Sequence, residues 1–274
     1  MQEPAPASEN WDCHAHLFGP YARHPLPAGS GFVPPEATQA DYLALLKRIG
    51  CTHGVLVHPS AYGEDLSLLE EALAAHANLR GVIVARDMPL ARLRELRARG
   101  VRAARFSHRS GAGANLAGSA SFADMLRLAP RLAEAGLHAE LWTDARALPA
   151  IAAQLRALPV PVVIDHMGMF DLQAGVADPG FQALLALVAQ GRTWVKLCAY
   201  RNLLAAPDPQ AGRPFHEALV RANPQRLVWG SDWPHLRITP SPDAAQLLAL
   251  LRQWTPDAAR LAQILRHNPQ ALYQ

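Results

Sequence analysis

The sequence predicts an α/β protein: a single-domain (β/α)8 TIM barrel that spans residues 1–274. Two observations predict this fold. Eight short runs rich in Val, Ile and Leu recur along the chain, and stretches with apolar residues three and four positions apart separate them. Strands that alternate with helices form parallel βα units, and eight such units within roughly 250 residues are what a closed barrel requires.

The expected strands follow one another along the whole chain. They are Trp11–His16, His53–His58, Gly81–Ala85, Val101–Phe106, His138–Trp142, Val160–Asp165, Trp194–Cys198 and Leu227–Gly230. The spacing of apolar residues predicts a helix after each of several strands, for example at Tyr42, Leu45, Leu46 and Ile49. The longest expected loop, residues 19–35, is rich in Pro and Gly and follows the first strand. In a barrel it lies over the mouth as a partial lid.

An open, doubly wound sheet is the alternative to the barrel. Such a sheet favours a glycine-rich phosphate loop after its first strand. The sequence has His14-Ala15-His16 at that place, which favours the barrel.

Composition narrows the possible classes of protein. The formal net charge is only +3 and the basic residues are scattered, so we expect no nucleic-acid partner. No run approaches the roughly 18 apolar residues of a membrane helix, and the first residues do not resemble a signal peptide. Cys13, Cys51 and Cys198 form no CxxC pair, so we expect neither a disulfide framework nor a zinc knuckle. The expected location is cytoplasmic, and the oligomeric state is not indicated.

Residues with catalytic chemistry gather where the expected strands end. In a barrel the carboxyl ends of the strands face one mouth, where active sites lie. His14 and His16 alternate along the first strand and therefore point the same way. His166 follows the sixth strand and Asp232 the eighth. Each residue alone has a structural explanation, such as a helix cap or a buried histidine, but together they favour a catalytic site.

Four segments resemble the amidohydrolase superfamily, in its branch of small lactone hydrolases. They are Trp-Asp-Cys-His-Ala-His-Leu-Phe-Gly-Pro at 11–20, His-Pro-Ser at 58–60, Val-Ile-Asp-His-Met-Gly at 163–168 and Val-Trp-Gly-Ser-Asp-Trp-Pro-His at 228–235. The resemblance extends over nearly the whole chain. It implies a (β/α)8 barrel that hydrolyses a cyclic ester, with a role in the breakdown of aromatic or carbohydrate acids.

The resemblance also implies roles for particular residues. His14, His16 and His166 match the histidines of the family's barrel mouth, and Asp232 matches its catalytic aspartate. The positions that match substrate-contacting residues are Ser60, Arg105 and Arg201, the two arginines as partners of substrate carboxylates.

Three expected substrate-binding positions depart from the pattern of the pyrone lactonases. Met169 stands where these proteins usually have an arginine, and Phe32 and Trp142 stand where they have tyrosines. Each charge-assisted hydrogen bond that is lost is worth roughly 1.5–3 kcal/mol. The departures therefore predict a less anionic or more apolar lactone.

The expected mechanism is hydrolysis without an obligatory metal. Asp232 is the candidate general base, and the three histidines stabilise the charge that develops on the carbonyl oxygen. One zinc ion held by His14, His16, His166 and Asp232 is the alternative. Arginine and tryptophan at the ends of the fourth and fifth strands argue against it, because nearby arginines repel a cation.

Two other functions stay open from the sequence. One is a metal-dependent amidohydrolase or decarboxylase that acts on a small aromatic or cyclic acid. The other is a barrel without catalytic activity that binds a small acid. Fold alone does not separate them, since barrels support many chemistries.

Overall fold

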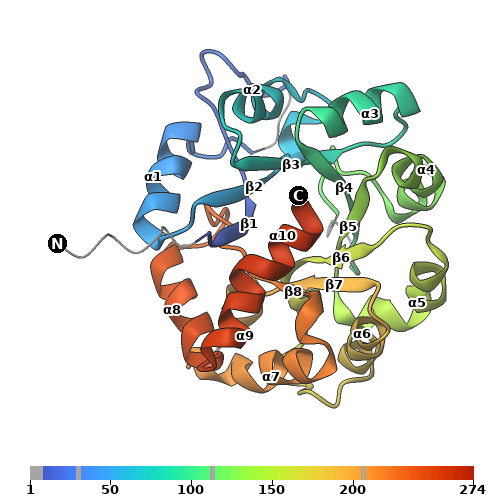
Figure 1. Ribbon diagram of the computed structural model, residues 1–274, viewed down its shortest axis with the longest axis vertical. Coiled ribbons are helices and arrows are strands. Elements are labelled where there is room, and N and C mark those ends of the chain that lie inside the picture. The colour runs from blue at the N-terminus through green and yellow to red at the C-terminus, as the bar shows by residue number, and fades with distance from the viewer. Residues whose placement is uncertain (1–8, 29–31, 112–114, 205, 207) are drawn as a thin grey trace.

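The computed structural model describes residues 9–28, 32–111, 115–204, 206 and 208–274. Within this part of the chain, eight parallel strands form one sheet in sequence order (Figure 1). Their bounds are β1 (Trp11–Ala15), β2 (His53–Val57), β3 (Leu79–Val84), β4 (Val101–His108), β5 (His138–Thr143), β6 (Val162–Ile164), β7 (Thr193–Lys196) and β8 (Leu227–Val228).

Helices surround the sheet as an outer ring (Figure 1). In the described residues the ring contains α1 (Gln39–Ile49), α2 (Ser67–Ala75), α3 (Leu90–Ala98), α4 (Phe122–Ala135), α5 (Leu148–Ala157), α6 (Pro179–Ala189), α7 (Arg213–Ala222) and α8 (Ala244–Trp254). Two further helices, α9 (Ala258–Ala262) and α10 (Asn268–Tyr273), lead across one end of the barrel. None of the helices in the described residues is long and apolar enough to cross a membrane.

Local sequence determines where several of these helices begin and end. A capping box of Thr38 and Asp41 opens α1, and Ser121 and Asp124 form the same motif at α4. Both helices end at a glycine in the left-handed conformation, which lacks the steric penalty of a Cβ atom there. These signals set the lengths of the helices and hence of the loops that carry the site.

Hydrogen bonds between the first strand and the segment after the last strand close the barrel. Cys13 N donates to Trp229 O at 2.9 Å, and His16 N donates to Trp233 O at 2.8 Å. Gly230 permits this approach, because a Cβ atom there would lie only 2.7 Å from His14 Cβ. The predicted single-domain barrel is confirmed, and the open doubly wound sheet is wrong.

The sixth strand is shorter than predicted, ending at Ile164 and not at Asp165. After it the backbone turns sharply: His166 and Met167 have φ values of 50° and 53°, in the left-handed region that side chains rarely adopt. The eighth strand likewise ends at Val228, two residues before its predicted end. In both cases the chain leaves the sheet just before the residues with candidate catalytic roles.

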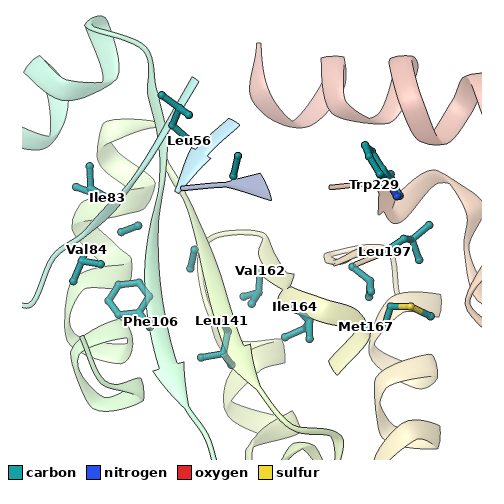
Figure 2. Packing of buried hydrophobic residues seen from close by; sticks show 14 of the residues in the cluster. Leu56, Ile83, Val84, Phe106, Leu141, Val162, Ile164, Met167, Leu197 and Trp229 are labelled. Carbon is teal, nitrogen blue, oxygen red and sulfur yellow. The ribbon is translucent and has the colours of Figure 1, made fainter. Parts of the chain in front are cut away.

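The apolar core has two parts. The larger lies between the strands and the helices, where Leu56, Ile83, Phe106 and Ile164 pack (Figure 2). The smaller fills the inside of the barrel and includes Tyr273 from α10. This helix lies across the end of the barrel viewed in Figure 1, where the strands begin. The opposite end is left for the site.

Candidate active site

The four predicted catalytic residues converge at the carboxyl ends of the strands. His14 Nε2 and His16 Nε2 lie 3.5 and 3.4 Å from Asp232 Oδ1. His166 Nδ1 lies 3.9 Å from Asp232 Oδ2. The structure thus brings together residues that are more than 200 positions apart in the sequence.

The two oxygens of Asp232 have different surroundings. Oδ2 accepts hydrogen bonds from the Tyr200 hydroxyl at 2.7 Å and from Arg201 Nε at 2.6 Å. Oδ1 is buried and has no hydrogen-bond partner among the described residues. Burial opposes ionisation of this carboxyl, but Arg201 and the neighbouring histidines outweigh it and hold its pKa well below the usual range. Asp232 is therefore an ionised carboxylate with one free oxygen.

The histidines around this carboxylate differ in their exposure. His16 and His166 line the cavity described below, whereas His14 lies behind them and is fully buried. Burial, followed by the charge of Lys196, lowers the pKa of His14 to about 4, and burial lowers the pKa of His166 well below its ordinary value. Both rings are thus neutral at pH 7.

A cavity of about 590 Å³ opens onto these groups. Its floor contains His16, His166 and Asp232. Its wall includes the predicted substrate-binding residues Ser60, Phe32, Arg105, Trp142 and Arg201. The volume is sufficient for a small organic acid.

The expected lid is a wall of this cavity, so far as it is described. Pro27, Ala28, Phe32 and Pro34 line the cavity. Residues 29–31 of the expected lid lie outside the described residues. Met169 is half-buried, has a φ of 44° and is not among the cavity-lining residues, so the structure does not bring it together with the other predicted site residues.

Two arginines of the cavity wall are held by buried carboxylates. Arg105 Nε donates to Asp165 Oδ2 at 2.7 Å, just as Arg201 Nε donates to Asp232. The terminal nitrogens of both guanidinium groups have no hydrogen bond within the described part of the chain. A guanidinium group anchored through Nε keeps two parallel donors for a carboxylate or sulfonate.

The Trp142 ring lies close to two arginines, Arg105 and Arg109. The guanidinium carbons of Arg105 and Arg109 are 5.2 and 4.8 Å from the centroid of its ring. Its indole Nε1 is buried without a partner among the described residues. A buried donor that lacks a partner is costly, so this nitrogen is suited to an acceptor on a bound ligand.

Sequence reasoning missed three residues of the site. Tyr200 binds Asp232, Lys196 contacts His14, and Arg237 lines the cavity, where its guanidinium carbon lies 4.8 Å from the centroid of the Phe32 ring. Tyr200 and Arg237 each follow a strand end and could have been found there. Lys196 lies inside a buried strand, where a lysine is itself a signal.

The clustered side chains were also tested as a metal site. Two groups bring three possible ligand atoms within 4.8 Å of one another: His14, His16 and Asp232, and His14, Asp165 and His166. A metal-bound histidine needs one bare nitrogen and donates the other N–H to an acceptor. His16 meets this condition, since its Nδ1 lies 2.7 Å from Val57 O.

His14, which both groups share, does not meet it. Its Nδ1 lies 3.2 Å from Lys196 Nζ, which can only donate, and this contact favours an acceptor at Nδ1 with the ring proton on Nε2. Because Nε2 is the atom that faces Asp232, the donor set as it stands does not fit a divalent cation.

Comparison with known proteins gives a consistent result. The amidohydrolase family model matches residues 11–274. A 4-sulfomuconolactone hydrolase of Rhizobium radiobacter is 34% identical over 269 residues, which cover 96% of this chain and 89% of that protein.

Two solved structures share the fold. A putative 2-pyrone-4,6-dicarboxylic acid hydrolase from Pseudomonas putida is 30% identical with a TM-score of 0.82, and the match covers 97% of both chains. An amidohydrolase from Burkholderia multivorans with bound zinc is 20% identical with a TM-score of 0.72, covering 96% of this chain and 98% of that one. The same fold therefore also occurs with bound zinc.

Proposed function

The chain belongs to the amidohydrolase family, and we propose that it opens a small anionic lactone by adding water to the ester carbonyl. The free oxygen of Asp232 on the cavity floor is the observation that carries this proposal. It is an ionised acceptor in a position to take a proton from water. The names of the relatives, which are lactone hydrolases, support the reaction class.

The residues on the floor of the cavity have different roles in hydrolysis. The attacking water donates a hydrogen to Asp232 Oδ1, beside the His16 ring, whose Nε2 lies 3.4 Å from that oxygen. His16 Nδ1 donates to Val57 O, which leaves Nε2 to accept the hydrogen of His14 Nε2, 3.2 Å away. His166 is neutral and lines the cavity, so its N–H stabilises the oxyanion as water adds. The proton taken by Asp232 then passes to the leaving oxygen. His14 is fully buried behind His16 and His166 and does not contact the substrate.

The cavity wall indicates an anionic substrate. Arg105 and Arg201 present free terminal nitrogens, and Arg237 lines the cavity without an acidic partner among the described residues. The expectation of a less anionic lactone was based on Met169, Phe32 and Trp142. Phe32 and Trp142 line the cavity, but Met169, which marks the lost positive charge, does not. We therefore favour a lactone that carries acidic substituents.

We propose that this reaction needs no metal, because Lys196 and the arginines place positive charge around the candidate ligands. We further propose a cytoplasmic enzyme that acts on a small molecule without a nucleic-acid partner. The modest charge of +3 and the three free cysteines support this.

The first test is proton release by protein treated with a chelator, over a panel of lactones that ranges from pyrone dicarboxylates to sugar-acid lactones. We expect acid production from at least one lactone with acidic substituents. Activity that appears only after zinc is added would instead support a metal-dependent amidohydrolase. Release of carbon dioxide without new acid would support a decarboxylase, and binding without turnover would support a barrel that only binds.

Arg237 should determine preference among the lactones. In Arg237→Ala we expect the KM for a dicarboxylated lactone to rise about tenfold, the equivalent of one charge-assisted hydrogen bond. The kcat and the KM for a monocarboxylated analogue should change little. Arg221→Ala is the matched control, since Arg221 is an exposed arginine of α7 that does not line the cavity. Equal effects on both substrates would contradict this role.

A further inference from the structure

Below the site, inside the barrel, lies a cluster of charged side chains that the proposed mechanism does not use. Lys196 Nζ lies 2.6 Å from Glu140 Oε2 and 3.6 Å from Asp165 Oδ1, and all three side chains are fully buried. Asp165 in turn binds Arg105. Two positive and two negative charges thus balance one another, as ions removed from water must.

Lys196 keeps its charge in this cluster. Burial opposes protonation of the amine, but Glu140 and Asp165 prevail and raise the pKa of Lys196 above its ordinary value. The Tyr273 hydroxyl donates to Glu140 Oε1 at 2.8 Å and so holds that carboxylate from the end of the barrel where the strands begin. The ammonium group is therefore held in one place.

The ammonium also determines the proton on His14. Lys196 Nζ lies 3.2 Å from His14 Nδ1, and an ammonium group has only hydrogens to offer. The other contact of Nδ1, to Asp165 Oδ1, is longer at 3.5 Å. A proton on Nδ1 would also face the ammonium hydrogens. The shorter contact with Lys196 therefore favours a neutral ring with its proton on Nε2.

This places an N–H at the centre of the site. His14 Nε2 lies 3.2 Å from His16 Nε2 and 3.5 Å from Asp232 Oδ1. We propose that Lys196 is a positioning residue, which keeps the His14 proton on Nε2 so that His14 donates to His16 and cannot bind a metal ion there. The catalytic half of this role rests on the proposed function, whereas the proton position and the metal exclusion do not.

The test compares three variants of this protein with the wild type. Lys196→Met alone removes one positive charge and leaves the buried cluster with one excess negative charge. The double variant Lys196→Met with Glu140→Gln removes one charge of each sign and keeps the cluster balanced. Tyr273→Phe is the matched control, because it deletes a hydrogen bond from the same buried cluster but leaves Lys196 in place.

Two readouts do not depend on any substrate. Side-chain ¹⁵N–¹H NMR should show His14 protonated on Nε2 in the wild type and in Tyr273→Phe. In the double variant the proton should move to Nδ1, where it can donate to Asp165. Equilibrium dialysis with zinc chloride should then find zinc bound at least tenfold more tightly by the double variant than by the wild type, the usual range for groups that orient a ligand.

The third readout is kinetic. The double variant should lose about tenfold in kcat with KM changed little, while Tyr273→Phe stays near the wild type. A wild-type spectrum with His14 protonated on Nδ1 would overturn the proposal even if no variant folds. Unchanged zinc affinity in a folded double variant would overturn it as well. A wild type inactive on every lactone would instead refute the proposed function and leave the NMR and zinc results to decide the role of Lys196.

Discussion

Replacing Asp232 by asparagine should reduce kcat for lactone opening by roughly 10³-fold, the range expected for loss of a general base. The amide has the shape of the carboxylate, and its oxygen can still accept from Tyr200 and Arg201. Its NH₂ group then replaces Oδ1, the atom without a partner that receives the proton from water. Initial rates of proton release on the best lactone of the panel measure the effect.

Asp87→Asn is the control for this variant. Asp87 is exposed and pairs with Arg131, so the same chemical change there should leave kcat unaltered. Thermal unfolding should show that Asp232→Asn is folded. If a folded Asp232→Asn keeps a tenth or more of the wild-type rate, another group takes the proton and the assignment fails.

Acid should destabilise the fold well before most carboxylates titrate. Burial lowers the pKa of His14, His58 and His216 from 6.5 to about 4. Below pH 6.5 the unfolded chain binds protons that the folded chain does not, so the free energy of unfolding falls as pH falls from 6.5 towards 4. Each such histidine contributes roughly 1.4 kcal/mol per pH unit.

Asp12 opposes part of this change. Burial raises its pKa from 3.8 to about 6, so between these values the folded state holds a proton that the unfolded state releases. Three histidines outweigh the single opposing effect of Asp12. Unfolding with guanidinium chloride should therefore give a lower free energy of unfolding at pH 5 than at pH 7.5. His216→Gln is the check, because its amide can still bind Thr255. In this variant the change of the free energy of unfolding with pH should be smaller by the contribution of one histidine. A free energy of unfolding that does not change between these pH values would contradict the argument.

The fold and the centre of the site could be predicted because both depend on periodic patterns. Val, Ile and Leu runs mark strands, and the rule that strand ends face one mouth placed His14, His16, His166 and Asp232 together. The substrate-binding roles expected for Arg105 and Arg201 came from the family resemblance. The rule on strand ends requires only the order of elements along the chain.

The remaining features depend on contacts that no local pattern contains. Lys196 meets Glu140 and His14 across the inside of the barrel, from strands that are not neighbours in sequence. Met169 occupies a position of the matching motif, yet it follows a run of residues with positive φ and does not line the cavity. Arg237 contacts Phe32 of a loop some 200 residues earlier. Pairing over such distances in sequence is decided by three-dimensional packing.

Tyr273 also constrains how the molecule can assemble during its synthesis. This side chain fills the inside of the barrel and binds Glu140, while its carbonyl oxygen accepts from Arg80 Nε and Arg102 Nε at 3.1 and 2.9 Å. A nascent chain cannot complete that interior until residue 273 has left the ribosome. Early strands must therefore wait with apolar faces uncovered, the condition under which growing chains aggregate. Chaperones should therefore be most important until the segment that contains Tyr273 has left the ribosome.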